Sequence, residues 1–152
     1  DIIRFLFSAN KNQPLQSVSE VASGGEISRL MLSLKALIAH AMALPSIVFD
    51  EVDTGVSGEI ADKMAGIMRE MAECMQVISI THLPQVASLG QTHYRVYKSD
   101  TETSTATHLI KLSEKERIEE IARMLSGSSL TAAALDNACE LLKRNDLKDG
   151  KK

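Results

Sequence analysis

In the first half of the chain, segments with the apolar pattern of a strand take turns with segments that have the apolar pattern of a helix. A run rich in β-branched and aromatic residues predicts a strand over residues 2–8, and a polar stretch containing proline predicts a loop over residues 9–19. Just after Gly25, apolar residues begin to recur every three or four positions, which predicts a helix ending near Ala41. The apolar face of this helix comprises Ile27, Leu30, Met31, Leu34, Leu37, Ile38 and Ala41.

Two short apolar runs, residues 47–49 and 77–80, predict buried strands on either side of a second helix. Ser57 is a candidate N-cap for that helix, and Pro84 is expected to open a short helix after the second run. The resulting order of strands and helices predicts an α/β fold in which helices flank a mostly parallel sheet. The apolar residues of the second helix are Ile60, Met64, Ile67, Met68 and Met71, and we interpret its methionines as core residues.

The second half of the chain has a different pattern. Residues 94–98 and 105–112 flank a polar turn and predict a small β-hairpin. Two C-terminal helices should follow, over residues 114–126 and 130–142, with Gly127 capping the first and the remaining residues fraying. We expect the residues Glu114-Lys115-Glu116-Arg117 to be a solvated helix start. The expected division is one domain over residues 1–145 and a polar tail over residues 146–152.

Composition narrows the class of protein. The chain is 44% hydrophobic and 24% charged, as in an ordinary globular domain, and with 3% aromatic residues its core must be mainly aliphatic. A net charge of −3 does not suggest nucleic-acid binding through bulk positive charge. Cys74 and Cys139 form no CxxC pair, so we expect free thiols rather than a disulfide or zinc site. Neither a membrane span nor a signal peptide is visible, and we expect a cytoplasmic protein without membrane contact.

A first candidate site is the segment Ser23-Gly24-Gly25-Glu26, which immediately precedes a predicted helix. The two glycines allow close approach of the backbone to a ligand. The free N–H groups and positive dipole end of the helix favour an anion, and the Ser23 hydroxyl adds a donor. The alternative is a flexible turn in which Ser23 is only the N-cap.

A second candidate is Asp50-Glu51, directly after the apolar residues 47–49. A buried strand that ends in two acids can hold Mg²⁺, which prefers oxygen ligands and keeps several waters. The neighbouring carboxylate could then orient or deprotonate an attacking water. The alternative is an acidic pair that merely ends the strand in solvent.

His82 follows the next predicted strand, so a parallel sheet would bring it near Asp50 and Glu51. A histidine in that place can polarise or sense a terminal phosphate. The alternative is a structural histidine. His40, His93 and His108 have no evident partners in the sequence and stay unassigned.

Together these motifs resemble the signature motif, Walker B and switch histidine of ABC-type ATPases. Residues 49–64 (FDEVDTGVSGEIADKM), 80–90 (ITHLPQVASLG) and 119–127 (EEIARMLSG) are similar to the C-terminal lobe of the head in the RecN family. That family consists of bacterial DNA-repair ATPases related to the SMC proteins, and the similarity runs from about residue 2 to 142. The expected fold is thus the C-terminal lobe of a P-loop, ABC-type head.

The sequence departs from the wider ABC pattern at a few positions. Ala22 stands where the signature motif usually has Leu, and Glu26 where many members have Gln. Residues 54–57 correspond to the D-loop of ABC proteins, and Ser57 stands where many members have Asp. This difference puts the communication role of that loop in doubt. Ser57 would then act mainly as a helix cap.

The resemblance implies a role for each candidate. Asp50 would hold Mg²⁺, Glu51 would orient or activate the attacking water, and His82 would contact the γ-phosphate. The ATP on the opposite subunit would be contacted by the signature residues, with Arg29 supporting their helix. Those signature residues are Ser23, Gly24, Gly25 and Glu26.

One expected part of an ATP site is missing. A Walker A motif needs two glycines five positions apart, and no two of the eight glycines have that spacing. The resemblance implies that an N-terminal lobe, joined through a coiled coil, supplies Walker A, that heads pair as a homodimer, and that DNA binds the full-length protein. We expect the chain to be a piece of a longer protein and inactive alone. Two alternatives stay open: a non-hydrolysing interaction domain, and a self-sufficient phosphohydrolase using Asp50 and Glu51 as metal ligands.

Overall fold

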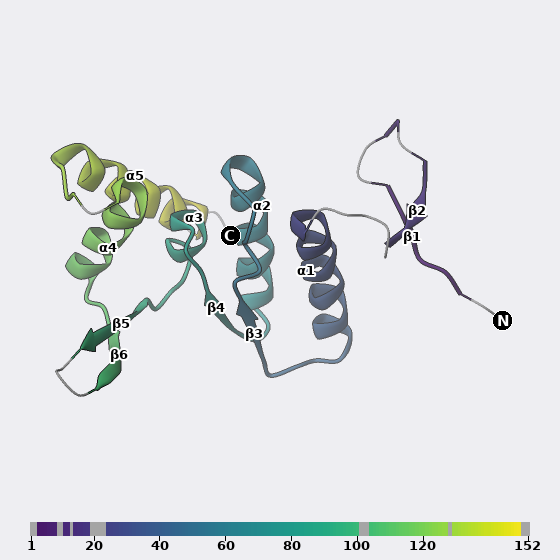
Figure 1. Cartoon of the computed structure of the whole chain (residues 1–152), viewed down its shortest axis with the longest axis horizontal. Coiled ribbons are helices and arrows are strands. Elements are labelled where there is room, and N and C mark those ends of the chain that lie inside the picture. Colours follow the sequence, from purple (N-terminus) through teal and green to yellow (C-terminus); the bar gives the residue numbers. More distant parts are fainter. Residues whose placement is uncertain are drawn as a thin grey trace. The chain divides into compact units, whose positions relative to one another are not determined.

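The computed structural model describes residues 3–8, 11–12, 14–18, 24–100, 104–127 and 129–149, without the side chains of residues 24–26 and 144–149. The chain divides into two compact units, residues 1–81 and 82–152. The elements of both units carry the labels of Figure 1.

The first unit begins with a short antiparallel pair. Strand β1 (Leu6–Phe7) pairs with β2 (Gln16–Ser17), so that Leu6 lies opposite Ser17. The prediction of a strand over residues 2–8 was therefore too long, and part of the predicted loop is a strand. The apolar side chains here are largely exposed, 76% for Phe5, so no burial favours a longer ladder.

The main part of this unit contains the predicted helix–strand–helix–strand series. Its elements are α1 (Gly24–Ala41), β3 (Ser46–Asp50), α2 (Gly58–Ala72) and β4 (Gln76–Ile80). Strands β3 and β4 are parallel and in full register from Ser46 opposite Gln76 to Asp50 opposite Ile80. The described strands form three two-stranded sheets, of which only β3–β4 is parallel, so a mostly parallel sheet is not confirmed.

Helix α2 carries most of the core of the first unit and packs against α1 and β4. The methionines Met64, Met68 and Met71 are buried, which confirms their interpretation as core residues. Ser57 occupies the N-cap position with an extended backbone, as predicted, but its side chain makes no capping hydrogen bond. The fully buried Phe49 of β3 completes this core, with the Lys35 ammonium 5.9 Å from the centre of its ring.

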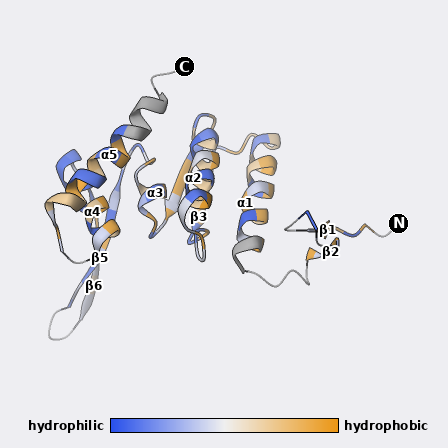
Figure 2. Ribbon diagram, turned by 90° about the horizontal axis from the view of Figure 1, so that it is seen from above, coloured by the Kyte–Doolittle hydropathy of each residue, from blue (hydrophilic) through white to orange (hydrophobic). Residues whose placement is uncertain are grey.

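Helix α1 differs from its prediction in the face that it buries. Leu32 and Ala39 are buried, whereas the predicted apolar face is largely exposed, including 69% of Leu37 and 53% of Ile38. Hydrophobic residues recur along α1 (Figure 2), and several of them, such as Met31 and Leu34, are exposed. A helix that is apolar on most sides is typical of the interior of a larger assembly, and one small unit can cover only part of it.

The second unit contains the predicted hairpin and C-terminal helices. Its elements are α3 (Pro84–Ala87), β5 (Tyr94–Asp100), β6 (Thr105–Lys111), α4 (Glu114–Ser126) and α5 (Ala132–Asp149). Helix α5 starts two residues later than predicted and continues beyond residue 142. No helix among the described residues is sufficiently long and apolar for a membrane span.

Helices α4 and α5 pack through alanine and larger aliphatic side chains. Ile121 and Ala122 of α4 are buried against Ala134 and Ala138 of α5. The residue ending α4 is Gly127, as predicted, with a φ of 77° that disfavours other residues. Cys139 of α5 and Cys74 of the first unit are free, as expected.

Glu114, Lys115 and Glu116 at the start of α4 are exposed, as expected of a solvated helix start, but Arg117 is not. Ser113 and Glu116 form a capping box, and the hydrogen bonds from Ser113 lower the pKa of the Glu116 carboxyl. The half-buried Arg117 side chain donates to the carbonyl of Ser88 (2.8 Å) and to that of Gly90 (2.5 Å). Burial, and secondarily the charge of Arg117, lower the pKa of His93. The interpretation of Arg117 as a solvated residue was therefore wrong.

Replacing Arg117 with Ala should destabilise the chain, because two backbone carbonyls would lose a charged donor. Hydrogen bonds to charged groups contribute about 1.5–3 kcal/mol, and we expect a loss in that range in urea unfolding followed by circular dichroism. Lys115→Ala, an exposed neighbour on the same helix, is the matched control and should change the free energy of unfolding by less than about 0.5 kcal/mol. Equal effects of the two substitutions would contradict an anchoring role for Arg117.

Candidate functional site

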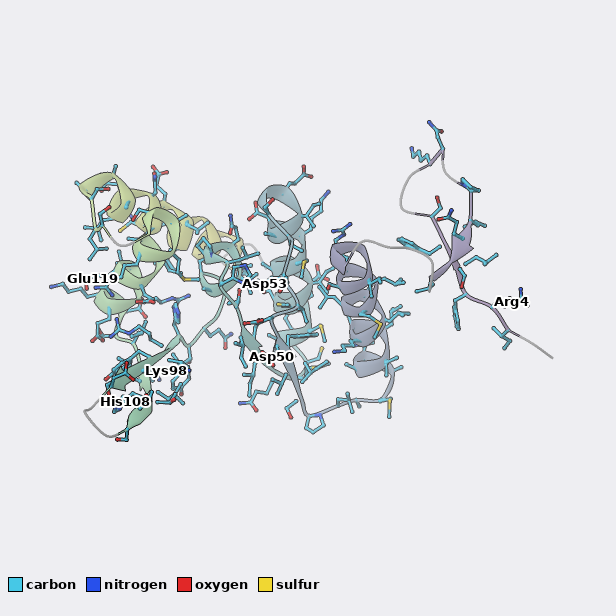
Figure 3. All side chains as sticks on the ribbon, in the orientation of Figure 1. Arg4, Asp50, Asp53, Lys98, His108 and Glu119 are labelled. Atoms are coloured by element: carbon cyan, nitrogen blue, oxygen red, sulfur yellow. The ribbon has the colours of Figure 1, made fainter. Side chains whose placement is uncertain are left out.

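The predicted acidic site lies at the carboxyl end of β3. Along β3 the side chains alternate, so that Val48 and Asp50 share one face of the ladder and Phe49 lies on the other. Phe49 is 0% exposed, and its burial fixes the direction of its neighbour. Asp50 is consequently held on the exposed face, beside Ile80 of β4 (Figure 3 labels Asp50).

Glu51 turns the chain sharply away from the sheet. Its backbone has a φ of 47°, in the left-handed region that non-glycine residues rarely occupy. Hydrogen bonds on both sides of the residue hold this conformation. The Glu51 amide donates to the Ile80 carbonyl (3.0 Å), and the Glu51 carbonyl accepts from the amide and hydroxyl of Thr54 (3.2 and 2.9 Å). The carboxylate remains exposed, where it could meet a ligand. A rare backbone conformation at an exposed acid is a feature typical of functional sites.

Asp53 is a third acid in this turn, and our sequence analysis did not select it. It is 1% exposed, and its carboxylate accepts a hydrogen bond from the hydroxyl of Thr81, the residue after β4. Figure 3 labels Asp53 near Asp50. Asp53 lies within the stretch that resembles the RecN family. However, neither periodicity nor charge distinguishes this buried carboxylate from the two exposed ones before it.

The structure describes the predicted signature residues only in part. Ser23 lies outside the described residues, and the backbone of Gly24, Gly25 and Glu26 forms the first turn of α1. Arg29 is half-buried in the next turn, where its carbonyl accepts from the Ser33 hydroxyl (3.1 Å).

His82 is an exposed residue that opens the second unit. The residues that the structure unites are therefore Asp50, Glu51 and the end of β4. The roles predicted for the signature residues and for His82 remain predictions. Of the unassigned histidines, His108 stacks on Tyr97 and shares a 2.7 Å hydrogen bond with Ser99.

The residues at the end of β3 fit a magnesium ion of the kind that accompanies nucleotides. Mg²⁺ usually takes one or two carboxylates from the protein and completes its shell with water and phosphate oxygens. The exposed Asp50 carboxylate can serve as such a ligand. Within the described part of the chain, no group of three or more His, Cys, Asp or Glu side chains could hold a metal by itself. The phosphohydrolase alternative, which needs several protein ligands, thus gains no support there.

Comparison with solved structures defines the class of the fold. One similar structure is that of an SMC ATPase studied for its ATP-driven dimerisation and DNA-stimulated activation. The match covers 78% of this chain and 70% of the SMC chain, with a TM-score of 0.59 and 17% sequence identity. An SMC head bound to the C-terminal winged-helix domain of ScpA matches 68% of this chain and 31% of its own, with a TM-score of 0.57 and 21% identity. The chain therefore has the α/β fold of ABC/SMC-type ATPase heads.

Sequence comparison places the chain within that class. It is 44% identical to the DNA repair protein RecN of Vibrio cholerae over 142 residues, which are 93% of this chain and 26% of that protein. It is also 44% identical to RecN of Bacillus subtilis over 146 residues, 96% of this chain and 25% of that protein. No protein-family model matches. The chain thus corresponds in sequence to one segment of these RecN proteins, and it spans about a quarter of their length.

Proposed function

We propose that this chain is the C-terminal half of a RecN-like ATPase head that binds and hydrolyses ATP when two heads dimerise. The observation that carries this proposal is the acidic turn at the end of β3. It presents Asp50 on the exposed face of a parallel ladder and fixes the backbone of Glu51 against β4. Ligands of parallel α/β folds bind at this end of the strands. The whole protein would act in DNA repair, as the name of its RecN relatives says, and we propose that this repair concerns double-strand breaks and recombination.

An N-terminal lobe carrying Walker A and a coiled coil is the first partner that we propose. Parallel sheets are normally buried on both faces, but β3 and β4 have one apolar face that is exposed. On this face Val48 is 56% exposed, Ile78 45% and Ile80 54%. The exposed apolar side of α1 adds to the uncovered surface. Surfaces of this kind support a partner that completes the fold.

The proposed chemistry assigns one task to each residue. The Glu51 carboxylate orients the attacking water and accepts its proton as the water attacks the γ-phosphorus of ATP. The bond from that phosphorus to the leaving oxygen of ADP then breaks. His82 binds the γ-phosphate, while Mg²⁺, held by Asp50, would neutralise charge on the phosphate oxygens.

The second proposed partner is another head. The signature residues Ser23, Gly24, Gly25 and Glu26, supported by Arg29, would contact the ATP of the opposite subunit through the start of α1. ATP would then join the two heads, and hydrolysis would separate them. We further propose that DNA binds the assembled protein and that the protein is cytoplasmic. Residues 1–145 would form the lobe and 146–152 a polar tail, into which α5 continues as far as Asp149.

Turnover measured with a separate N-terminal lobe tests this proposal. We expect no ATP hydrolysis by the chain alone and measurable hydrolysis after mixing with the N-terminal lobe of a RecN relative, because each lobe carries only part of the site. The N-terminal lobe alone is the matched control. ATP-dependent association without hydrolysis would favour the non-hydrolysing interaction domain. Hydrolysis by the chain alone would contradict the half-site.

A further inference from the structure

The turn after β3 is attached at two points, one to the last residue of β4 and one to the residue after it, and only the first involves Glu51 itself. The amide of Glu51 donates to the carbonyl of Ile80 (3.0 Å). Two residues further along the turn, the Asp53 carboxylate accepts from the hydroxyl of Thr81. The two attachments thus join Glu51 and Asp53 of the turn to the last residue of β4 and to the residue that follows it.

The second attachment is built into the interior of the unit. Asp53 is 1% exposed, and a carboxylate removed from water must be hydrogen-bonded to be tolerated. Its own carbonyl accepts from the amide of Val56, which is 5% exposed. Gly55, between Asp53 and Val56 in the sequence, has a φ of 74°, which allows the chain to turn back so that this hydrogen bond can form. Asp53 is therefore fixed from both its side chain and its backbone.

The position of the proposed catalytic carboxylate depends on this turn. Glu51 has a left-handed backbone and an exposed side chain, so the direction of its carboxylate follows from how the turn is held. A general base must lie within hydrogen-bonding distance of its water, and a displacement of about 1 Å can reduce the rate about 100-fold.

We infer that Asp53 and Thr81 are positioning residues that hold the Glu51 turn in its productive geometry against the end of β4. This inference rests on the proposed ATPase function. Asp53 and Thr81 would act through Glu51 and not on ATP directly.

Kinetics of Thr81 variants provide the first test. Thr81→Val keeps the shape of the side chain but removes the donor, whereas Thr81→Ser keeps the donor. In the chain mixed with the N-terminal lobe, we expect Thr81→Val to lower kcat by roughly 10–100-fold with KM for ATP changed less than about threefold. Thr81→Ser should restore most of kcat. Thr107→Val, an exposed threonine on β6, is the matched control and should behave as the unchanged chain does. Unchanged kcat in a folded Thr81→Val chain would overturn the inference.

Amide hydrogen exchange of the chain alone gives a second test that needs no hydrolysis. Thr81→Val should accelerate exchange at the Glu51 and Thr54 amides by about tenfold relative to Thr81→Ser, because the turn would open more often. Exchange at Val48, inside β3, serves as an internal reference and should not change. Absence of turnover in the unaltered mixture would count against the proposed function alone, whereas unchanged exchange at Glu51 would overturn the positioning role.

Discussion

Glu51→Gln should lower the kcat of the mixed head by about 10²–10⁴-fold, the usual contribution of a general base. Glutamine has nearly the same size and can still bond to a water molecule, but it cannot accept a proton. ATP-dependent association of the heads should therefore persist or become longer-lived. Steady-state hydrolysis, together with sizing of the mixture in the presence of ATP, measures both effects.

Glu70→Gln is the matched control for Glu51→Gln, since Glu70 is an exposed acid on α2 with the same side chain. It should leave hydrolysis unchanged. A mixture in which Glu51→Gln retains nearly full kcat would show that Glu51 is not the base. Loss of association along with hydrolysis would instead assign Glu51 a structural part in head pairing.

Phe49→Ala should lower the free energy of unfolding by about 3–5 kcal/mol, as expected for removing a fully buried aromatic side chain. Phe49 is 0% exposed and is one of the largest buried side chains in the chain. Its loss would leave a cavity in the core of the first unit. Because domains have only about 5–15 kcal/mol of stability, the first unit could unfold outright. Urea denaturation followed by circular dichroism measures the change.

Phe5→Ala is the matched control for the core substitution, because Phe5 is 76% exposed. Its effect should stay within about 0.5 kcal/mol. If Phe49→Ala were equally mild, Phe49 would not be the residue that fixes β3 in the core, and the direction of Asp50 would need another explanation.

Periodicity in the sequence predicted the elements around the site well. The helix–strand–helix–strand series from α1 to β4, the hairpin β5–β6 and the core methionines of α2 were all predicted. The buried face of α1 was predicted incorrectly, because a helix with apolar residues on most sides carries no signal for which side is covered. The extent of the parallel sheet could not be predicted either, because the pattern of one strand does not say which other strands pair with it.

The site was predicted from motifs, and its internal connections were not. The acids Asp50 and Glu51 stand out because they follow an apolar strand. The hydrogen bond of the buried Asp53 joins it to Thr81, 28 positions away, and no local sequence pattern encodes such a contact. Arg117 was misjudged likewise, since its partners, the carbonyls of Ser88 and Gly90, lie in a distant loop that offers no side-chain signal.

The left-handed backbone of Glu51 sets stability and activity against each other. An L-residue in that region costs roughly 1–2 kcal/mol that glycine would avoid. Selection for thermal stability alone would consequently favour glycine at this position and remove the carboxylate proposed for catalysis. Consensus or stability-guided redesign of such heads should hold residue 51 fixed, because the substitution that most improves its backbone would also end its chemistry.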